Sequence, residues 1–197
     1  MSASTHERLK IGIILGSTRP GRNGEAVARW VLEGARARKD GVDYELVDLA
    51  DFHLPLLDEP YPPAMGRYSQ PHTKAWSAKI QPLDGFVFVT PEYQHSTSAA
   101  LKNAIDYLYG EWVDKAAGFV SYGSAGGIRA VEHLRGILSE VQVATVRAQV
   151  WFSLFDDFEQ MRSFRPRPEK RDQLTAMLDQ LGRWAGALRP LRATPHP

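Results

Sequence analysis

Cysteine is absent from this chain of 197 residues, and its absence excludes several kinds of chemistry. Disulfide bonds, thiolate nucleophiles, iron–sulfur clusters and cysteine-ligated zinc all require a residue that the sequence does not contain. Any redox reaction would therefore depend on a bound cofactor.

An excess of charge of one sign is also missing, because 24 Lys and Arg face 23 Asp and Glu and leave a net charge of +1. Without a strong field we expect no nucleic acid partner. No stretch approaches the roughly 20 apolar residues of a membrane-spanning helix, and the segment MSASTHERLK lacks the apolar centre of a signal peptide. We therefore expect a cytoplasmic protein with no membrane partner.

What the chain does contain is the composition of a folded domain, with 43% apolar and 24% charged residues. A chain of this length buries a sizeable core without metals or cross-links. We predict one domain over residues 1–197, with flexible ends at 1–8 and 190–197.

Apolar patterns of two kinds alternate along the chain. Short apolar or alternating runs predict strands, and apolar residues at helical spacing predict helices. The expected strands are 9–15, 43–49, 83–90, 117–122 and 141–152; the expected helices are 25–38, 72–80, 99–109, 128–140 and 169–188. The proline-rich stretch 50–71 is expected to be a surface loop. This alternation predicts an α/β fold, a parallel sheet with helices on both faces.

The first unusual loop, 16–24, has the sequence GSTRPGRNG and joins the first strand to the first helix. A helix N-terminus favours an anion, and the hydroxyls and guanidiniums of the loop suit phosphate. Gly16 and Gly21 imitate the spacing of a P-loop, but Arg22 and Asn23 stand where Lys and Ser or Thr are needed. The loop predicts a site for a terminal phosphate, and the alternative is a glycine-rich turn with surface arginines.

Two further loops follow predicted strands and should reach the same edge of the sheet. Residues 90–98, TPEYQHSTS, combine a proline, an aromatic ring and polar groups, which suits a flat heteroaromatic ligand; the alternative is a capped turn into the next helix. Residues 121–127, SYGSAGG, contain three glycines that let the backbone approach a ligand closely. Tyr122 stands two residues before Ser124, so this is not the nucleophile elbow of a hydrolase.

Other polar residues carry weaker signals. The histidines are scattered and none shows the spacing of a helical metal pair, so we predict no metal site. The basic cluster within 162–171 is expected to be a solvated loop. Arg129 follows the third loop closely enough to face the predicted crevice.

With these three loops the sequence resembles the NADPH-dependent FMN reductase family, a flavodoxin-like group that includes quinone, chromate and azo-dye reductases. The resemblance covers roughly residues 10–150 and rests on three segments in the same order, each after a strand: GSTRPGRNGEAVARW, TPEYQHSTSAALKNAIDYL and GFVSYGSAGGIRAVEHLR. It implies a three-layer αβα sandwich with a five-stranded parallel sheet in the order 2-1-3-4-5. The chain differs at Gln94, where Asn is commoner, and at Arg22 and Asn23, where many members have Ser.

The family implies an FMN site built from all three loops. Ser17, Arg19, Arg22, Asn23 and Gly24 would hold the phosphate; Pro91, Glu92, Tyr93 and Gln94 would line the isoalloxazine ring; Ser121, Tyr122, Gly123, Gly126 and Gly127 would complete the ring pocket. The implied reaction is ping-pong: NADPH or NADH passes a hydride to FMN, and a small acceptor such as a flavin, quinone, azo compound or metal oxyanion then takes the electrons. The cofactor carries this chemistry, so no catalytic side chain is named.

The resemblance also implies a homodimer or homotetramer with the helix 99–109 at the interface. We expect the loop 50–71 to wall the crevice. Two other functions remain open, a flavodoxin-like electron carrier and a flavin-based redox sensor. A net charge of +1 and Arg19 argue against the carrier, because flavodoxins tend to be strongly acidic, and steady turnover of NAD(P)H would separate an enzyme from both.

Overall fold

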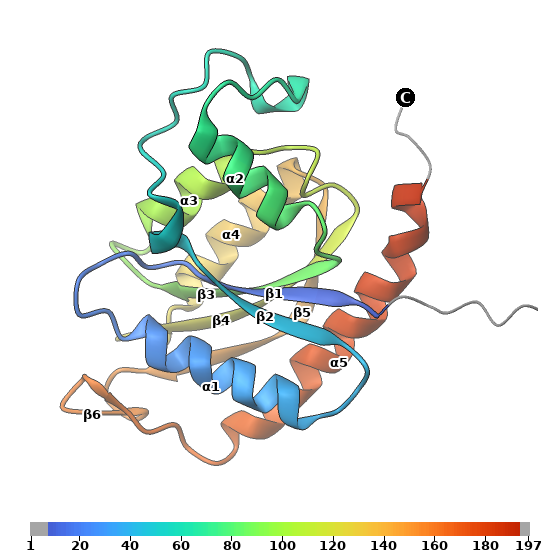
Figure 1. Ribbon diagram of the computed structural model, residues 1–197. Coiled ribbons are helices and arrows are strands. Elements are labelled where there is room, and N and C mark those ends of the chain that lie inside the picture. The colour runs from blue at the N-terminus through green and yellow to red at the C-terminus, as the bar shows by residue number, and fades with distance from the viewer. Residues whose placement is uncertain (1–7, 194–197) are drawn as a thin grey trace, which may run out of the picture.

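The computed structural model describes residues 8–193, which form a central parallel sheet with helices on both faces (Figure 1). The strands are β1 (Lys10–Leu15), β2 (Asp43–Asp48), β3 (Gly85–Pro91), β4 (Lys115–Gly123) and β5 (Val143–Ser153). The five strands lie in the order β2-β1-β3-β4-β5, and all neighbours are parallel. The predicted fold class and strand order are therefore confirmed.

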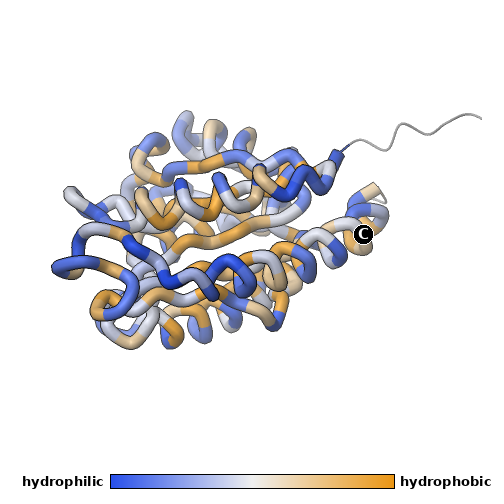
Figure 2. The backbone as a smooth tube through the Cα atoms, turned by 90° about the horizontal axis from the view of Figure 1, so that it is seen from below, coloured by the Kyte–Doolittle hydropathy of each residue, from blue (hydrophilic) through white to orange (hydrophobic). Residues whose placement is uncertain are grey.

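The helices divide between the two faces of the sheet. Helices α1 (Gly24–Ala37) and α5 (Lys170–Leu188) pack against one face, and α2 (Pro71–Ile80), α3 (Ala99–Asp106) and α4 (Ile128–Glu140) cover the other. Figure 2 shows apolar segments gathered between these layers and hydrophilic ones toward the outside. No helix within residues 8–193 has the length and apolar character needed to cross a bilayer.

The central strands are buried on both sides, which explains their nearly continuous apolar sequence. Every residue of β3 and β4 is buried, and β2 at the edge alternates more. Crossover helices cover both faces of a parallel sheet, so its inner strands need no polar face. The structure thus places the carboxyl ends of β1, β3 and β4 side by side at one edge.

Two boundaries differ from the predictions. We expected the third strand to stop before Pro91, but β3 includes this residue, which pairs in register with Tyr122. We expected a helix to Tyr109, but α3 ends at Asp106. The amide of Leu108 bonds the carbonyl of Ile105 at 3.3 Å, a tighter pattern that marks the end of an α-helix.

A small hairpin between β5 and α5 was not predicted. Its strands are β6 (Phe158–Glu159) and β7 (Ser163–Phe164). The buried carboxylate of Asp157 anchors it, accepting hydrogen bonds from the Ser153 amide at 2.9 Å and the Arg167 Nε at 3.1 Å. Each of these strands has two residues, too few to show an alternating pattern.

The basic cluster beside this hairpin is less exposed than expected. Lys170 is buried, and its ammonium lies 3.7 Å from the centre of the Trp151 ring. Burial lowers the pKa of Lys170, and the cation–π contact and the nearby Asp157 offset part of its desolvation. The expectation of a solvated loop is therefore wrong for this residue.

The C-terminal segment also departs from the expectation of a flexible end at 190–197. Residues Arg189–Ala193 form a 3₁₀ helix, in which Arg192 pairs with the Asp84 carboxylate and donates to the Asp114 carbonyl at 2.8 Å. At the other end, Arg8 pairs with Asp43 at 3.0 Å. The remaining residues of both expected flexible ends lie outside the described part of the chain.

Candidate functional site

Three loops converge at the carboxyl edge of the sheet, where open α/β sheets bind ligands. The first loop (16–24) follows β1, the second (90–98) follows β3, and the third (121–127) follows β4. Backbone hydrogen bonds tie their starts together: the Gly16 amide donates to the Val89 carbonyl at 2.9 Å, and the Glu92 amide donates to the Tyr122 carbonyl at 3.0 Å. The sheet order thus creates one composite site.

The end of the second loop is hydrogen-bonded to the start of the first loop through Ser98. Ser98 caps α3, because its Oγ accepts a hydrogen bond from the Leu101 amide at 3.1 Å, and the same hydroxyl donates to the Gly16 carbonyl. A Cβ on Gly16 would lie 2.8 Å from the Leu101 side chain. Only glycine fits this close approach, so the cap and the first loop form one packed unit.

Within the first loop, Ser17 connects to the second loop. Its buried hydroxyl lies 3.0 Å from the hydroxyl of Tyr93. The Arg22 guanidinium donates to the Ser17 carbonyl at 2.6 Å and forms a two-pronged ion pair with Asp48, with Nη1 2.9 Å from Oδ1. Arg22 therefore braces the loop, and Arg19 is the arginine of this loop whose side chain is exposed.

The start of α1 has no side-chain cap. Within the described residues, Asn23 at the N-cap makes no capping hydrogen bond, and its amide donates to the Met161 carbonyl of the hairpin at 2.9 Å. The first N–H groups of α1 therefore keep the favourable geometry of an anion site. The sequence alone did not predict that Asp48 pairs with Arg22 or that the Met161 carbonyl accepts from Asn23. For Asp48, its position near the end of a predicted strand was a signal that it could reach the first loop.

Tyr122 reaches this helix start from the third loop. Its ring is 5% exposed, and among the described residues its hydroxyl makes no hydrogen bond of normal geometry, although the Ser17 hydroxyl lies nearby. A Cβ on Gly24 would lie 2.5 Å from this hydroxyl oxygen, which shows how closely the tyrosine packs under α1. Burial raises the pKa of Tyr122 more than the nearby Ser17 hydroxyl lowers it, so the hydroxyl stays protonated and can donate.

The second loop contains a tight two-residue turn. Tyr93 and Ser96 exchange two backbone hydrogen bonds of 2.9 and 3.0 Å, and Gln94 and His95 between them have φ of 44° and 67°. Asn tolerates such left-handed backbone better than Gln, so the residue at position 94 is not the one that the turn favours. Gln94 and His95 are exposed at the tip of the turn.

An ion pair links the second loop to the helix after the third. The Arg129 Nε lies 2.6 Å from Oε1 of Glu92, whose side chain is 6% exposed. The other carboxylate oxygen of Glu92 is buried without a hydrogen-bond partner among the described residues. Arg129 therefore neutralises a buried carboxylate at the base of the site.

The third loop turns sharply through Gly126 and Gly127, with φ of 74° and 73°. A Cβ on Gly126 would lie 2.7 Å from the Trp151 ring, and one on Gly127 would lie 2.8 Å from Ser121 Cβ. The Ser121 hydroxyl donates to the Gly126 carbonyl at 2.7 Å. The Ser121 hydroxyl thus stabilises the turn, in which Gly126 and Gly127 are buried and Ser124 and Ala125 are exposed.

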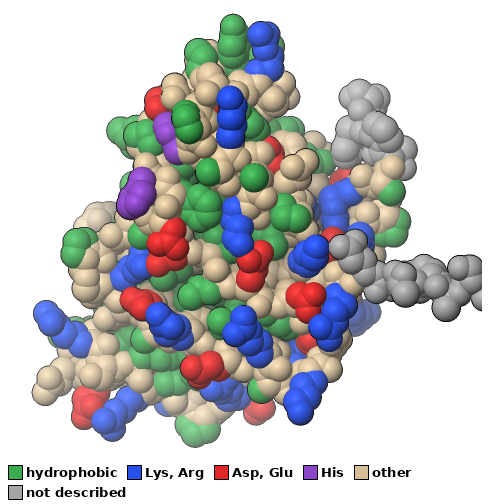
Figure 3. All heavy atoms as spheres, in the orientation of Figure 1, with side chains coloured by type: hydrophobic (Ala, Val, Ile, Leu, Met, Phe, Trp, Pro, Cys, Tyr) green, Lys and Arg blue, Asp and Glu red, His purple; other side chains and the backbone are tan. Residues whose placement is uncertain are grey.

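A cleft of about 470 Å³ borders the first loop on the side of β2. Its lining residues are Thr18, Leu49, Ala50, His53, Leu54 and Ala100, which come from the first loop, the segment after β2 and the start of α3. The segment after β2 therefore supplies one wall of a cleft at this edge. On the face shown in Figure 3, cationic and anionic side chains are interspersed, without a large field of one sign.

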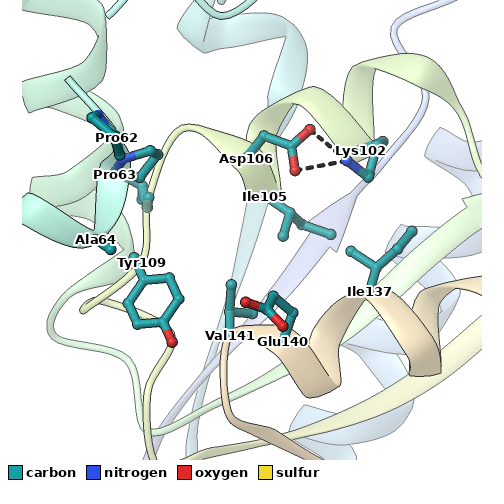
Figure 4. Close-up of a pocket in the computed structure, with 11 residues that line it drawn as sticks. Pro62, Pro63, Ala64, Lys102, Ile105, Asp106, Tyr109, Ile137, Glu140 and Val141 are labelled. Atoms are coloured by element: carbon teal, nitrogen blue, oxygen red, sulfur yellow. Dashed lines mark hydrogen bonds and ion pairs between the residues drawn. The ribbon is translucent and has the colours of Figure 1, made fainter. Parts of the chain in front are cut away.

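A second hollow, of about 370 Å³, lies between α3, α4 and the segment around Pro62 and Pro63. Figure 4 shows apolar side chains lining it, including Ile105, with the Lys102–Asp106 ion pair above them. It shares no lining residue with the cleft at the first loop. It therefore belongs to the outer surface of α3 and α4.

Comparison with known proteins gives consistent results. The profile of the NADPH-dependent FMN reductase family matches residues 9–157. An NAD(P)H-dependent FMN reductase of Schizosaccharomyces pombe is 48% identical over 134 residues, and one of a Nectria species is 44% identical over 126 residues. The alignments cover 66% and 61% of this chain and 66% and 63% of those relatives, so the chain spans just under two thirds of their length.

Among solved structures, the flavoenzyme NAD(P)H:acceptor oxidoreductase FerB of Paracoccus denitrificans has the same fold. Its TM-score is 0.70 at 19% identity, over 91% of this chain and 98% of that chain. At this identity the likeness concerns the fold alone.

Proposed function

Because the chain belongs to the NADPH-dependent FMN reductase family, we propose that it is an FMN-dependent oxidoreductase that oxidises NADH or NADPH and reduces a small acceptor. The observation that carries the proposal is the buried, unpaired Tyr122 hydroxyl beneath the open N-terminus of α1. A buried donor without a partner is costly, and a phosphate at the start of α1 would satisfy it once the residues that cover this hydroxyl move aside.

The phosphate of FMN fits the donors at the first loop. The Ser17 and Tyr122 hydroxyls, the exposed Arg19 and the open helix start are all donors or cations. Such a set favours a dianionic group. Arg22 and Asn23 are bound to protein partners, so we propose that they shape the loop and that any contact from them comes through their backbone.

The ring of FMN fits the second and third loops. The third loop exposes the small residues Ser124 and Ala125 at its tip, and the turn beside Tyr93 exposes Gln94 and His95. Flat heteroaromatic ligands are held by a combination of small residues, polar edges and an aromatic side chain. We propose Pro91 to Gln94 and Ser121 to Gly127 as the ring-binding segments.

FMN, when bound, accepts a hydride from the nicotinamide and returns the electrons to an acceptor. The protein's part is to hold the phosphate at α1, to orient the ring between the two later loops and to leave room beside it for the second substrate. The ion pair of Arg129 with Glu92 keeps a buried negative charge balanced next to the ring-binding segments. Preorganised positioning of this kind is what proteins contribute to cofactor chemistry.

The proposal includes a cytoplasmic homodimer or homotetramer assembled through α3. The apolar hollow between α3 and α4 supports this assembly, because uncovered apolar surface of this kind favours a protein contact. Light scattering after size-exclusion chromatography would give the oligomer mass. A chain that stays monomeric at micromolar concentration would contradict this part of the proposal.

The central test uses the purified protein with and without added FMN. Flavin absorption bands together with acceptor-dependent NAD(P)H oxidation, measured with benzoquinone, are expected. Arg19→Ala should weaken FMN binding by roughly 10-fold or more, the value of a lost charged hydrogen bond. Arg183→Ala removes an exposed arginine from α5 and serves as the matched control, with unchanged FMN affinity.

Each outcome separates a different function. Flavin binding without turnover would indicate an electron carrier or sensor and would overturn the reductase proposal. Absence of flavin uptake would overturn the FMN site itself. Equal losses of FMN affinity in Arg19→Ala and Arg183→Ala would show that Arg19 of the first loop does not contact FMN.

A further inference from the structure

The side chain of Glu92 lies where the second and third loops meet. Its backbone is fixed at the end of the sheet, because Pro91 pairs in register with Tyr122 and the Glu92 amide donates to the Tyr122 carbonyl at 3.0 Å. Its Cβ lies 3.2 Å from the point where a Cβ on Gly123 would stand. Glu92 is therefore packed against the third loop by the strand pairing itself, and its place does not depend on its charge partner.

The carboxylate of Glu92 is buried and has few partners. The side chain is 6% exposed, and Oε2 has no hydrogen-bond partner within the described residues. Oε1 accepts from the Arg129 guanidinium, with Nε at 2.6 Å and a second contact from Nη2. No other ion pair of Glu92 occurs within residues 8–193. A single guanidinium thus balances this buried charge.

Arg129 reaches Glu92 from the surface. It is the second residue of α4, directly after the third loop, and its side chain is 48% exposed. Without Arg129 the carboxylate would stay buried, because the sheet fixes the backbone of Glu92. A buried carboxylate without a counter-charge is strongly unfavourable, and solvent screens its field far less than that of a surface charge. Its charge would then act on a ligand held by the two loops.

The charge on a flavin ring is the property that this field would affect. A hydride carries two electrons with one hydrogen nucleus, so its transfer adds one negative charge to the ring until a further proton is taken up. An unbalanced carboxylate beside the ring opposes this added charge, and a balanced one does so much less. Arg129 can therefore favour the reduced cofactor through Glu92.

We propose that Arg129 is a positioning residue that acts through Glu92: it holds this carboxylate in a neutral pair between the ring-binding loops and thereby raises the reduction potential of bound FMN. The inference rests on the proposed function, and it deepens that function by assigning control of the flavin potential to two side chains of this chain.

The test is a cycle of Arg129→Gln, Glu92→Gln and the variant that carries both changes. Redox titration of the FMN-loaded proteins at about pH 8, where carboxylates are ordinarily ionised, gives the potential of the bound flavin. In Arg129→Gln the affinity for reduced FMN, relative to oxidised FMN, should fall roughly tenfold, which lowers the two-electron potential by about 30 mV. Adding Glu92→Gln removes the unbalanced charge and should restore the affinity ratio to within about twofold of its original value.

Arg8→Gln is the matched control, because it removes the same charge from an ion pair, with Asp43 at 3.0 Å, at the amino end of the sheet. It should leave the flavin potential unchanged. An unaltered potential in Arg129→Gln would overturn the proposal. A lowered potential that does not recover in the double variant would overturn it as well, because the effect would not pass through Glu92.

A second measurement needs no flavin. In urea denaturation of the flavin-free protein, Arg129→Gln should have a lower midpoint, and the double variant should regain it, because only the single variant buries an unbalanced charge. Equal midpoints in the unmodified protein and Arg129→Gln would contradict the neutral pair.

The two proposals fail in different ways. An unmodified protein that binds no FMN would overturn the proposed function and the control of the potential together. A protein that binds FMN and oxidises NAD(P)H, but whose flavin potential does not respond to Arg129→Gln, would leave the proposed function intact and overturn this inference alone.

Discussion

Replacing Tyr122 by Phe should stabilise the protein without flavin and weaken its binding of FMN. The ring of Tyr122 packs under the start of α1, and its hydroxyl has no partner among the described residues. Phe keeps the ring and its packing and removes only the hydroxyl. The two effects have opposite signs because the hydroxyl is unsatisfied in the free protein and, as we propose, paired in the complex.

The magnitudes follow from the burial of this group. An unsatisfied buried hydroxyl costs about 1–3 kcal/mol, so Tyr122→Phe should raise the free energy of unfolding of the flavin-free protein by an amount in that range. A hydrogen bond to a charged phosphate contributes about 1.5–3 kcal/mol, so the Kd for FMN should rise roughly 10- to 150-fold. The stability that added FMN confers should fall accordingly.

Urea denaturation with and without FMN, together with titration of flavin fluorescence, would measure both quantities. Tyr44→Phe is the control, since its hydroxyl is paired with Asp40 at 3.0 Å. It should lower the free energy of unfolding by about 1 kcal/mol and leave FMN affinity unchanged. A flavin-free Tyr122→Phe protein that is less stable, with unaltered FMN affinity, would refute the reasoning.

Three further predictions concern other parts of the molecule. Ser98→Ala should lower the free energy of unfolding by about 1–2 kcal/mol, measured by urea denaturation, because it removes the cap of α3 and the bond to Gly16; no loss would show that the cap is dispensable. Partial burial opposes ionisation of Glu59, but hydrogen bonds from Ser69 and Gln70 lower its pKa to about 2, so the bonds that close the 59–70 loop should be lost as pH falls from about 4.5 through 2. In limited proteolysis at acid pH, the protease should cut this loop faster in Glu59→Gln than in the unmodified protein. Burial lowers the pKa of Lys115 to about 7, so the folded state binds fewer protons than the unfolded state above that pH and stability should rise between pH 7 and about 10. Lys115→Met should flatten this rise in urea midpoints, and an identical slope would contradict the prediction.

The order of elements could be predicted from local patterns. Strands buried on both faces read as short apolar runs, and the 14-residue α1 reads as an amphipathic helix, because periodicity records which side of an element meets the core. The hairpin at β6 and β7 could not be found this way. The buried carboxylate of Asp157 anchors it, and no local pattern distinguishes a buried aspartate from an exposed one.

The sequence located the three loops of the candidate site, but it did not predict the role of each side chain within them. Arg19 and Arg22 are equivalent by sequence, yet Arg22 is bound by Asp48 from another strand and Arg19 is exposed. Ser121 resembles a ligand donor but bonds the carbonyl of Gly126. Such differences depend on partners that are distant along the chain, so only the folded arrangement reveals them.

The sequence by itself determined the class of fold, the edge of the sheet at which the three loops meet and the family, because these follow from periodicity and from motifs within single loops. The tertiary structure alone decided which polar groups are satisfied. It left the Tyr122 hydroxyl unpaired beneath α1, and it placed Arg129 against Glu92, which stands 37 residues earlier in the sequence. The physical reason is that hydrogen bonding and burial depend on which residues are neighbours in three dimensions. Residues far apart in the chain become neighbours only when the sheet brings them together.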